Sequence, residues 1–250
     1  MVDARMTEVS STYSDVDRSG DPAGAAAWMD EMATWPSVRA YKARTLDLLR
    51  DVAPVVDVGC GVGNDARAIG AIGIDPSFTM LTEARRRGGA YARGDVLALP
   101  IAAESMGGVR TDRVLQHVPD PADALDEIAR VLLVGGIAVL AEPDQGTLRI
   151  DGTDPELTPA IVRFRVGSIN NARLGGELAD RLTAMGFTDV GHESFPIELR
   201  DSALAFGLPT WPSMLVARGE WTRDEADRFL ASIGPDFLYR FDVVVTWGRR

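Results

Sequence analysis

The chain has few cysteines, no long apolar run and no signal core, and each of these absences excludes a class of protein. Cys60 is the only cysteine, so no intramolecular disulfide can form, which fits a reducing cytoplasm. The longest nearly uninterrupted apolar run, residues 131–141, is shorter than the ~18 residues that a membrane helix needs. The N-terminus carries charges early and has no apolar signal core. We therefore expect a cytoplasmic protein with no membrane partner.

Positive charge is also scarce. Lysine and arginine total 26 against 37 aspartate and glutamate residues, a net charge of −11, whereas nucleic-acid binding depends on neutralising phosphates. With two histidines and no closely spaced His/Cys/Glu cluster, no metal site is expected. The GxSxG motif and the Tyr-x-x-x-Lys pair are absent, which excludes the hydrolases and dehydrogenases that they mark. A small-molecule partner and no nucleic-acid partner are expected, and a homodimer is left open.

Strands and helices are predicted to alternate from residue 54 onward. The predicted strands cover 54–60, 71–75, 90–95, 107–115, 137–142, 190–198 and 237–247. The predicted helices cover about 64–69, 77–87, 121–134, 155–166, 176–185 and 222–233. This rhythm implies right-handed crossovers. We expect an α/β fold: a doubly wound, mostly parallel seven-stranded sheet with helices on both faces.

The segments outside the alternation of strands and helices are predicted to form a lid and a cap over the ligand-binding edge of the sheet. Residues 1–52 are expected to form a polar arm (1–20) and two lid helices, which begin near Asp21-Pro22 and at Pro36. Residues 53–250 form the main domain, with a cap segment at about 200–235. Several apolar residues of lid and cap form either a wall for a flat or lipid-like substrate or ordinary core. They are Trp28, Trp35, Phe206, Trp211 and Met214.

A glycine turn follows the first predicted strand in PVVDVGCGVGNDARAIGAIGID, residues 54–75. A dinucleotide-binding turn reads G-x-G-x-x-G, with pyrophosphate at the helix N-terminus. Here Asn64 replaces the third glycine of that pattern. Asp57, two residues before the turn, would repel a pyrophosphate and suits a cation.

Two further acids end the next strands. Asp75 ends the second strand, where a carboxylate accepts hydrogen bonds from both ribose hydroxyls, and Asp95 ends the third, within reach of an adenine amino group. A ligand with adenine, a free ribose, a cationic amino-acid end and no phosphate is S-adenosylmethionine.

Five motifs in order carry a family resemblance: DVGCGVG, GIDPSFTMLTEAR, GDVLALP, VRTDRVLQHVPDPADALDEIARVL and GGIAVLAEPD. They resemble the class I S-adenosylmethionine-dependent methyltransferases, in the branch of the ubiquinone and menaquinone biosynthesis enzymes. The resemblance covers residues 54–145 closely and 36–53 and 173–250 more loosely. It implies a Rossmann-like methyltransferase fold for residues 53–250. It also implies methyl transfer to O, N or C of a small molecule of secondary or quinone-like metabolism, with S-adenosylhomocysteine as the product.

The resemblance also implies cofactor contacts at the ends of four strands. The implied residues are Asp57, Gly59, Cys60, Gly61, Gly63, Asp75, Pro76, Asp95, Val96, Thr111, Asp112 and Arg113. Of these, Asp57 and the glycines would hold the methionine end, Asp75 the ribose and Asp95 the adenine. Lys42 and Arg44 are further candidates for contact with the cofactor carboxylate or an acidic substrate.

Three residues are candidate general bases. His117 follows the fourth strand, and an imidazole with a pKa near ~6.5 accepts a proton from a hydroxyl or amine. Glu142 and Asp144 end the fifth strand. Two other activities stay open: a cofactor-binding protein that catalyses a rearrangement without methyl transfer, and a nicotinamide-dependent oxidoreductase.

Overall fold

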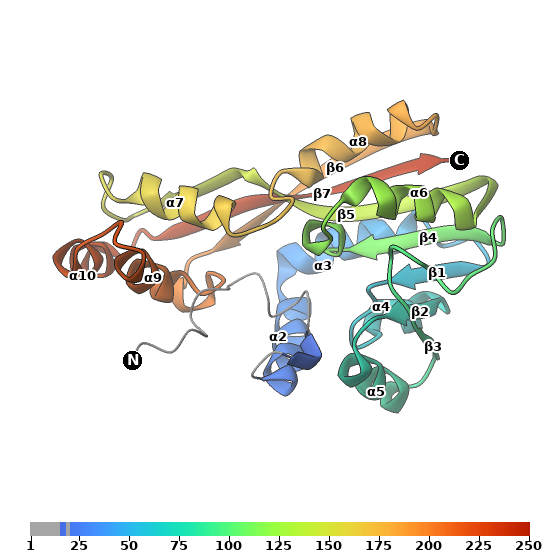
Figure 1. Ribbon diagram of the computed structural model, residues 1–250, viewed down its shortest axis with the longest axis horizontal. Helices are drawn as coiled ribbons and strands as arrows, with labels where there is room; N and C mark the ends of the chain where they lie inside the picture. The colour runs from blue at the N-terminus through green and yellow to red at the C-terminus, as the bar shows by residue number, and fades with distance from the viewer. Residues whose placement is uncertain (1–15, 19–20) are drawn as a thin grey trace.

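The computed structural model describes residues 16–18 and 21–250 (Figure 1). The expected arm, residues 1–20, lies outside the described residues except for the 3-10 turn η2, Val16–Arg18. Two helices follow, α2 (Pro22–Thr34) and α3 (Pro36–Asp47). The carboxylate of Asp21 accepts a hydrogen bond from the Gly24 N–H at 2.8 Å, which confirms the predicted start of α2.

Seven strands form one sheet. They are β1 (Val55–Val58), β2 (Ile72–Asp75), β3 (Ala90–Arg93), β4 (Met106–Asp112), β5 (Leu132–Asp151), β6 (Thr188–Leu199) and β7 (Leu238–Arg249). The strand order is β3-β2-β1-β4-β5-β7-β6. The pairings among the first five are parallel, whereas β7 is antiparallel to both β5 and β6. The expected mostly parallel sheet is therefore corrected to a mixed one, because the alternation that marks a strand carries no information on its direction.

Strand β5 is much longer than the predicted segment, 137–142. Helix α6 (Pro121–Val131) ends before the predicted end at residue 134, and the strand starts at Leu132 and runs to Asp151. Pairing with β4 stops at Ala141, but pairing with β7 continues to Asp151. Residues 143–151, 195–199 and 238–243 therefore project beyond the parallel strands, and we call them the strand extension.

Helices cover the sheet in two groups. Helices α4 (Asn64–Ile69) and α5 (Phe78–Arg87) pack on the parallel strands β1, β2 and β3, and α6 packs on β5. Helices α3 and α8 (Leu174–Ala184) pack on β5, β6 and β7, and α2 packs on α3 and α5. Helices α7 (Thr158–Gly167), α9 (Trp211–Ala217) and α10 (Arg223–Ser232) gather at the far end of the strand extension (Figure 1). Helix α9 was not predicted as a helix.

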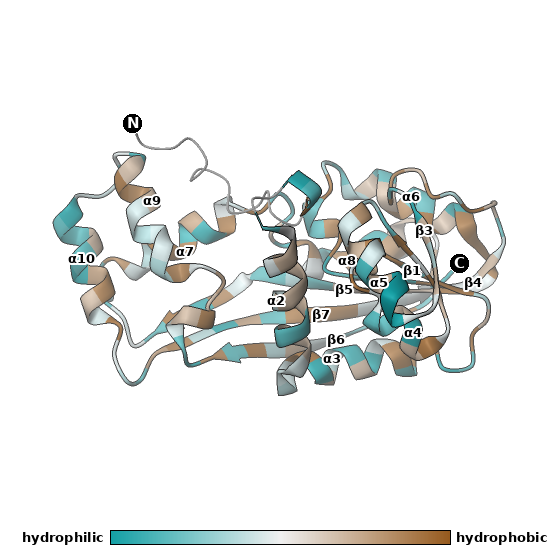
Figure 2. Cartoon of the chain, turned by 90° about the horizontal axis from the view of Figure 1, so that it is seen from below, coloured by the Kyte–Doolittle hydropathy of each residue, from teal (hydrophilic) through white to brown (hydrophobic). Residues whose placement is uncertain are grey.

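Alternate residues of β5 serve two cores. Val139 and Ala141 pack in the core that contains residues of α3, whereas Ala138 and Leu140 pack in the core that contains residues of α6 and α8. Both faces of the sheet are thus covered, as expected. Seen from below, α2 crosses the middle of the molecule, between the group of α7, α9 and α10 and the parallel strands (Figure 2). Within the described part of the chain, no helix has the length and apolar character that crossing a membrane demands.

Candidate active site

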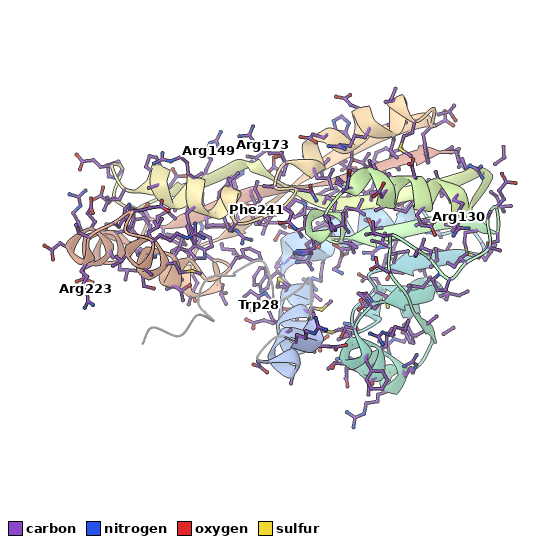
Figure 3. The ribbon with its side chains drawn as sticks, viewed as in Figure 1. Trp28, Arg130, Arg149, Arg173, Arg223 and Phe241 are labelled. Carbon is purple, nitrogen blue, oxygen red and sulfur yellow. The ribbon has the colours of Figure 1, made fainter. Side chains whose placement is uncertain are left out.

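A cavity of about 860 Å³ lies where the parallel strands end and the strand extension begins. Gly59, Asp75 and Asp112 line one half, which we call the cofactor half. Trp28 from α2 and Phe241 from β7, both labelled in Figure 3, line the other, which we call the outer half. The two halves form one continuous space.

The glycine turn comes close to its neighbours at two positions. Gly59 has φ +69°, and a Cβ there would lie 2.2 Å from Cγ2 of Val114. Gly61 has φ +52°, and its Cβ would lie 2.3 Å from Cε of Met29 in α2. Only glycine adopts these conformations without strain and leaves the backbone open to the cavity. Gly63 and Cys60 do not line the cavity, and burial raises the pKa of the Cys60 thiol well above its usual value.

Asp75 stands at the end of β2, as predicted, and lines the cavity. It accepts hydrogen bonds from the Gly61 N–H at 2.8 Å and the Ser77 N–H at 2.9 Å. Burial raises the pKa of Asp75, and these two donors oppose the shift. The carboxylate therefore fixes the glycine turn and also faces the cavity, as does Pro76.

Asp17 is a neighbour that no sequence signal revealed. Its carboxylate accepts hydrogen bonds from the Ser77 hydroxyl at 2.7 Å and the Phe78 N–H at 2.8 Å, and it lines the cavity beside Asp75. The hydrogen bond from Ser77 is the largest cause that lowers the pKa of Asp17 to about 2.

The ends of β3 and β4 also reach the cavity. Asp95 and Val96 line it, and Asp95 is exposed and accepts a hydrogen bond from the Leu97 N–H at 3.0 Å. Asp112 and Arg113 line it as well. Thr111 does not; it is fully buried, and its hydroxyl has no hydrogen-bond partner among the described residues.

Asp57 lies behind the cavity and not in its wall. Its carboxylate pairs with the buried guanidinium of Arg110 at 2.8 Å. Arg110 also pairs with Asp65 at 3.0 Å and Asp112 at 3.1 Å, and Lys42 pairs with the same two acids. The structure thus places the Lys42 ammonium in this ion network. Burial raises the pKa of Asp57, whereas Lys42, Arg113 and Arg110 overcome burial and lower the pKa of Asp112 far below its usual value.

The structure brings only one of the three candidate bases to the cavity. His117 lines the cavity, but Glu142 and Asp144 do not; their neighbours Pro143 and Gln145 do, because side chains alternate along a strand. Glu142 is fully buried and accepts hydrogen bonds from the N–H groups of Val114 and Leu115, both at 2.8 Å. Asp144 accepts from the Gly146 N–H at 2.8 Å.

The environment of His117 keeps its imidazole neutral. Burial, and then the charges of Arg113 and Arg165, lower the pKa of His117 to about 4. Arg165 of α7 and Gln145 of β5 line the cavity near the outer half, and the sequence interpretation missed both. Nothing in the sequence around Arg165 distinguishes it from the exposed Arg163 on the same helix.

Comparison with known proteins places the chain in a family. Residues 56–140 match the family described as "Methyltransferase domain". The trans-aconitate 2-methyltransferase of Methylobacterium nodulans is 31% identical over 244 residues, which span 86% of this chain and 90% of that one. The chain belongs to the S-adenosylmethionine-dependent methyltransferases.

Two further similarities bear on this methyltransferase. An uncharacterized 37.1 kDa protein in transposon TN4556 of Streptomyces fradiae is 40% identical over 64% of this chain, which spans only 51% of that protein. The YcgJ protein of Bacillus subtilis has the same fold, with a TM-score of 0.60 at 16% identity over 83% of this chain and 98% of that one. The seven-stranded Rossmann-like methyltransferase fold is thus confirmed.

Proposed function

We propose that this methyltransferase transfers a methyl group from S-adenosylmethionine, bound in the cofactor half of the cavity, to a small molecule bound in the outer half. The observation that carries the proposal is the single cavity that joins the ends of β1, β2 and β4 to an aromatic pocket under the strand extension. A methyl donor and an acceptor must lie in one water-poor space, in line with each other.

The cofactor half fits S-adenosylmethionine by its donor set. The glycine turn presents backbone without side chains, and Asp75 keeps lone pairs for ribose hydroxyls after serving two backbone donors. Asp95 with Val96 would take the adenine, and Asp112 the ammonium group. When bound, the cofactor supplies an electrophilic methyl group. The described lining of this half carries four acids, Asp17, Asp75, Asp95 and Asp112, and three arginines, Arg18, Arg93 and Arg113. The excess of acids suits a cationic ligand better than a diphosphate.

Asp57 would act through other residues. It holds Arg110, which with Lys42 and the hydroxyl of Tyr41 fixes the carboxylate of Asp112. Because the pKa of Asp112 is lowered, that group stays ionised, and its pairs with Lys42, Arg110 and Arg113 hold it in the cavity wall.

His117 is the proposed proton acceptor for a hydroxyl or amine nucleophile. It is the one candidate base of the three that lines the cavity, and its lowered pKa keeps it unprotonated at neutral pH. Glu142 would position it, because its carboxylate holds the backbone N–H groups at the start of the 3-10 turn η3 (Leu115–His117).

Calorimetry tests the cofactor part of the proposal. We expect S-adenosylhomocysteine to bind with micromolar affinity and NADH not to bind. Transfer of labelled methyl from S-adenosylmethionine to small molecules of a metabolite extract tests the acceptor part. Binding of NADH alone, or methyl transfer only to macromolecules, would contradict the proposal.

The class of acceptor, the metabolic context, the location and the oligomeric state are proposed from the sequence and from similar proteins. A relative named for trans-aconitate supports a small-molecule acceptor. The place in secondary or quinone-like metabolism, the ubiquinone-like branch, the cytoplasmic location and a homodimer stay predictions.

A further inference from the structure

Arg165 brings a positive charge into the outer half of the cavity. Its side chain lines the cavity, and no carboxylate of the described residues lies within ion-pair distance of its guanidinium. Its guanidinium carbon lies 5.5 Å from the ring centroid of Trp211 and 5.8 Å from that of Phe206. Aromatic faces hold a guanidinium in place without neutralising it.

A buried donor of Arg165 also lacks a partner. The Nε of Arg165 has no hydrogen-bond partner in the described part of the chain. Trp211 and Tyr239 pack beside Arg165, but neither lines the cavity, and the Tyr239 hydroxyl interacts with Arg165 itself. A buried donor is costly unless a partner arrives, and the partner that suits a cation is an anion.

The charges of the cavity are arranged by half. Four acids that line it, Asp17, Asp75, Asp95 and Asp112, lie at the N-terminal turn or at the ends of β2, β3 and β4, and so do three arginines, Arg18, Arg93 and Arg113. The described lining of the outer half is otherwise apolar or neutral, as at Ile197, Phe206 and Phe241. A ligand bound against Arg165 therefore meets one positive charge and no negative one.

Gln145 adds a second polar group to this half. It is 2% exposed, lines the cavity, and its Oε1 accepts no hydrogen bond from the described residues. The turn before α8 holds its backbone, since its N–H donates to the Ala172 carbonyl at 2.7 Å. Gln145 thus offers an acceptor oxygen from a held backbone position.

We propose that the acceptor of this methyltransferase carries a carboxylate, which pairs with the guanidinium of Arg165, and a hydrogen-bond donor, which meets Gln145. The inference rests on the proposed function, because it assigns the acceptor end of the same cavity. A single guanidinium without a second free cation suits the single charge and planar fork of a carboxylate better than a phosphate.

Matched ligand pairs test the inference on the full chain saturated with S-adenosylhomocysteine. The probes are benzoate against benzamide, and 3-phenylpropionate against its amide, measured by calorimetry at constant ionic strength. We expect each carboxylate to bind about tenfold or more tightly than its amide, the scale of a charged hydrogen bond. Arg165→Gln should abolish that preference, and Arg165→Lys should keep part of it. Arg163→Gln, on the exposed face of α7, should leave it unchanged.

Each outcome decides between two failures. Three outcomes overturn the inference alone, provided that S-adenosylhomocysteine binds. They are equal binding of acid and amide, a preference that survives Arg165→Gln, and no saturable carboxylate binding at millimolar concentration. Failure of S-adenosylhomocysteine to bind the wild-type chain overturns the inference and the proposed function together. Unchanged affinity for S-adenosylhomocysteine in Arg165→Gln shows that the variant is folded.

Discussion

Asp75 is the residue on which the cofactor half depends most. Its two oxygens accept hydrogen bonds from Gly61 and Ser77 and leave further lone pairs toward the cavity. We predict that Asp75→Ala weakens S-adenosylhomocysteine binding about fivefold or more, which corresponds to ~1 kcal/mol, because charged hydrogen bonds are lost and the glycine turn loses its anchor. Calorimetry measures the change.

Asp126→Ala is the matched control, since Asp126 is exposed on α6 and away from the cavity. Its affinity should equal that of the wild type. Equal affinities for all three proteins would contradict the ribose assignment of Asp75.

Glu142 should make stability depend on pH. Burial raises its pKa from 4.5 to about 8, although backbone N–H groups oppose the shift. A carboxyl whose folded pKa is raised contributes stability below its unfolded pKa and loses it as pH rises through the folded pKa. We predict that the free energy of unfolding falls between about pH 5 and about pH 8 in the wild type, and falls less in Glu142→Gln.

Urea unfolding at several pH values across this window checks the prediction. Glu142→Gln keeps an acceptor for the Val114 and Leu115 N–H groups, so it should fold. Glu142→Ala leaves these donors without a partner and should lose at least ~2 kcal/mol at every pH. Parallel pH profiles for wild type and Glu142→Gln would refute the assignment.

Sequence reasoning could find residues at strand ends but not the direction in which they point. Asp75, Asp95 and His117 line the cavity because the ends of parallel strands share one edge of the sheet. Glu142 was misplaced because a one-residue step along β5 reverses the side chain. The partner of Asp57 is 53 residues away in β4, and no local pattern connects them.

At the scale of helices and strands, Arg110 connects two strands and two helices. It belongs to β4 and reaches Asp57 of β1, Asp65 of α4 and the Thr45 hydroxyl of α3, the last at 2.9 Å. The side chains of Arg110 and Asp57 are each 2% exposed. A buried charge without its partner is strongly destabilising, so the network fixes α3 and α4 against the sheet.

We predict that Arg110→Met lowers the free energy of unfolding by ~3 kcal/mol or more, because it leaves the Asp57 carboxylate buried and unpaired. Adding Asp57→Asn should recover part of the loss, with a coupling of ~1 kcal/mol or more, since the orphaned charge is removed. A double-mutant cycle in urea measures both quantities. Arg39→Met, on the exposed side of α3, should change stability by less than ~0.5 kcal/mol. Strict additivity of the two buried substitutions would show that the pair does not interact.

Local signals predicted most elements, and long-range pairing decided the rest. Helix α5 begins after Ser77, whose hydroxyl accepts from the Met80 N–H at 3.1 Å, and ends at Gly88, as the sequence indicates. The length of β5 has no such signal. The strand passes through Gly135 and Gly136, which a local interpretation takes as a stop, because β4 and β7 supply partners on both sides.

At the scale of the whole molecule, the mixed sheet separates the two ligands. The parallel strands end at the cofactor half, and the strand extension carries α7, whose Arg165 lines the outer half, with α9 and α10 beside it (Figures 1 and 2). Helix α2 touches both halves, because Met29 lies on the glycine turn and Trp28 packs against Phe206 with ring centroids 6.4 Å apart. The first half could be predicted from the sequence, but the second only in part, since it depends on how β5, β6 and β7 pair. Of the apolar residues offered as a substrate wall, Trp28 and Phe206 line the cavity, whereas Trp35, Trp211 and Met214 do not.

This division predicts where cofactor binding stabilises the chain. At a hundredfold excess over its dissociation constant, S-adenosylhomocysteine should raise the free energy of unfolding by ~2.7 kcal/mol, by mass action on the folded state. Hydrogen exchange should slow in the glycine turn, at the start of α5 and in α2, where cavity residues gather. It should stay unchanged in the exposed turns of α10, which contributes no residue to the cavity lining. Mass spectrometry of exchanged peptides, with and without S-adenosylhomocysteine, measures this distribution. Protection confined to α7 and to residues 203–207, which contribute to the lining of the outer half, would place the cofactor there and reverse the assignment of the two ends.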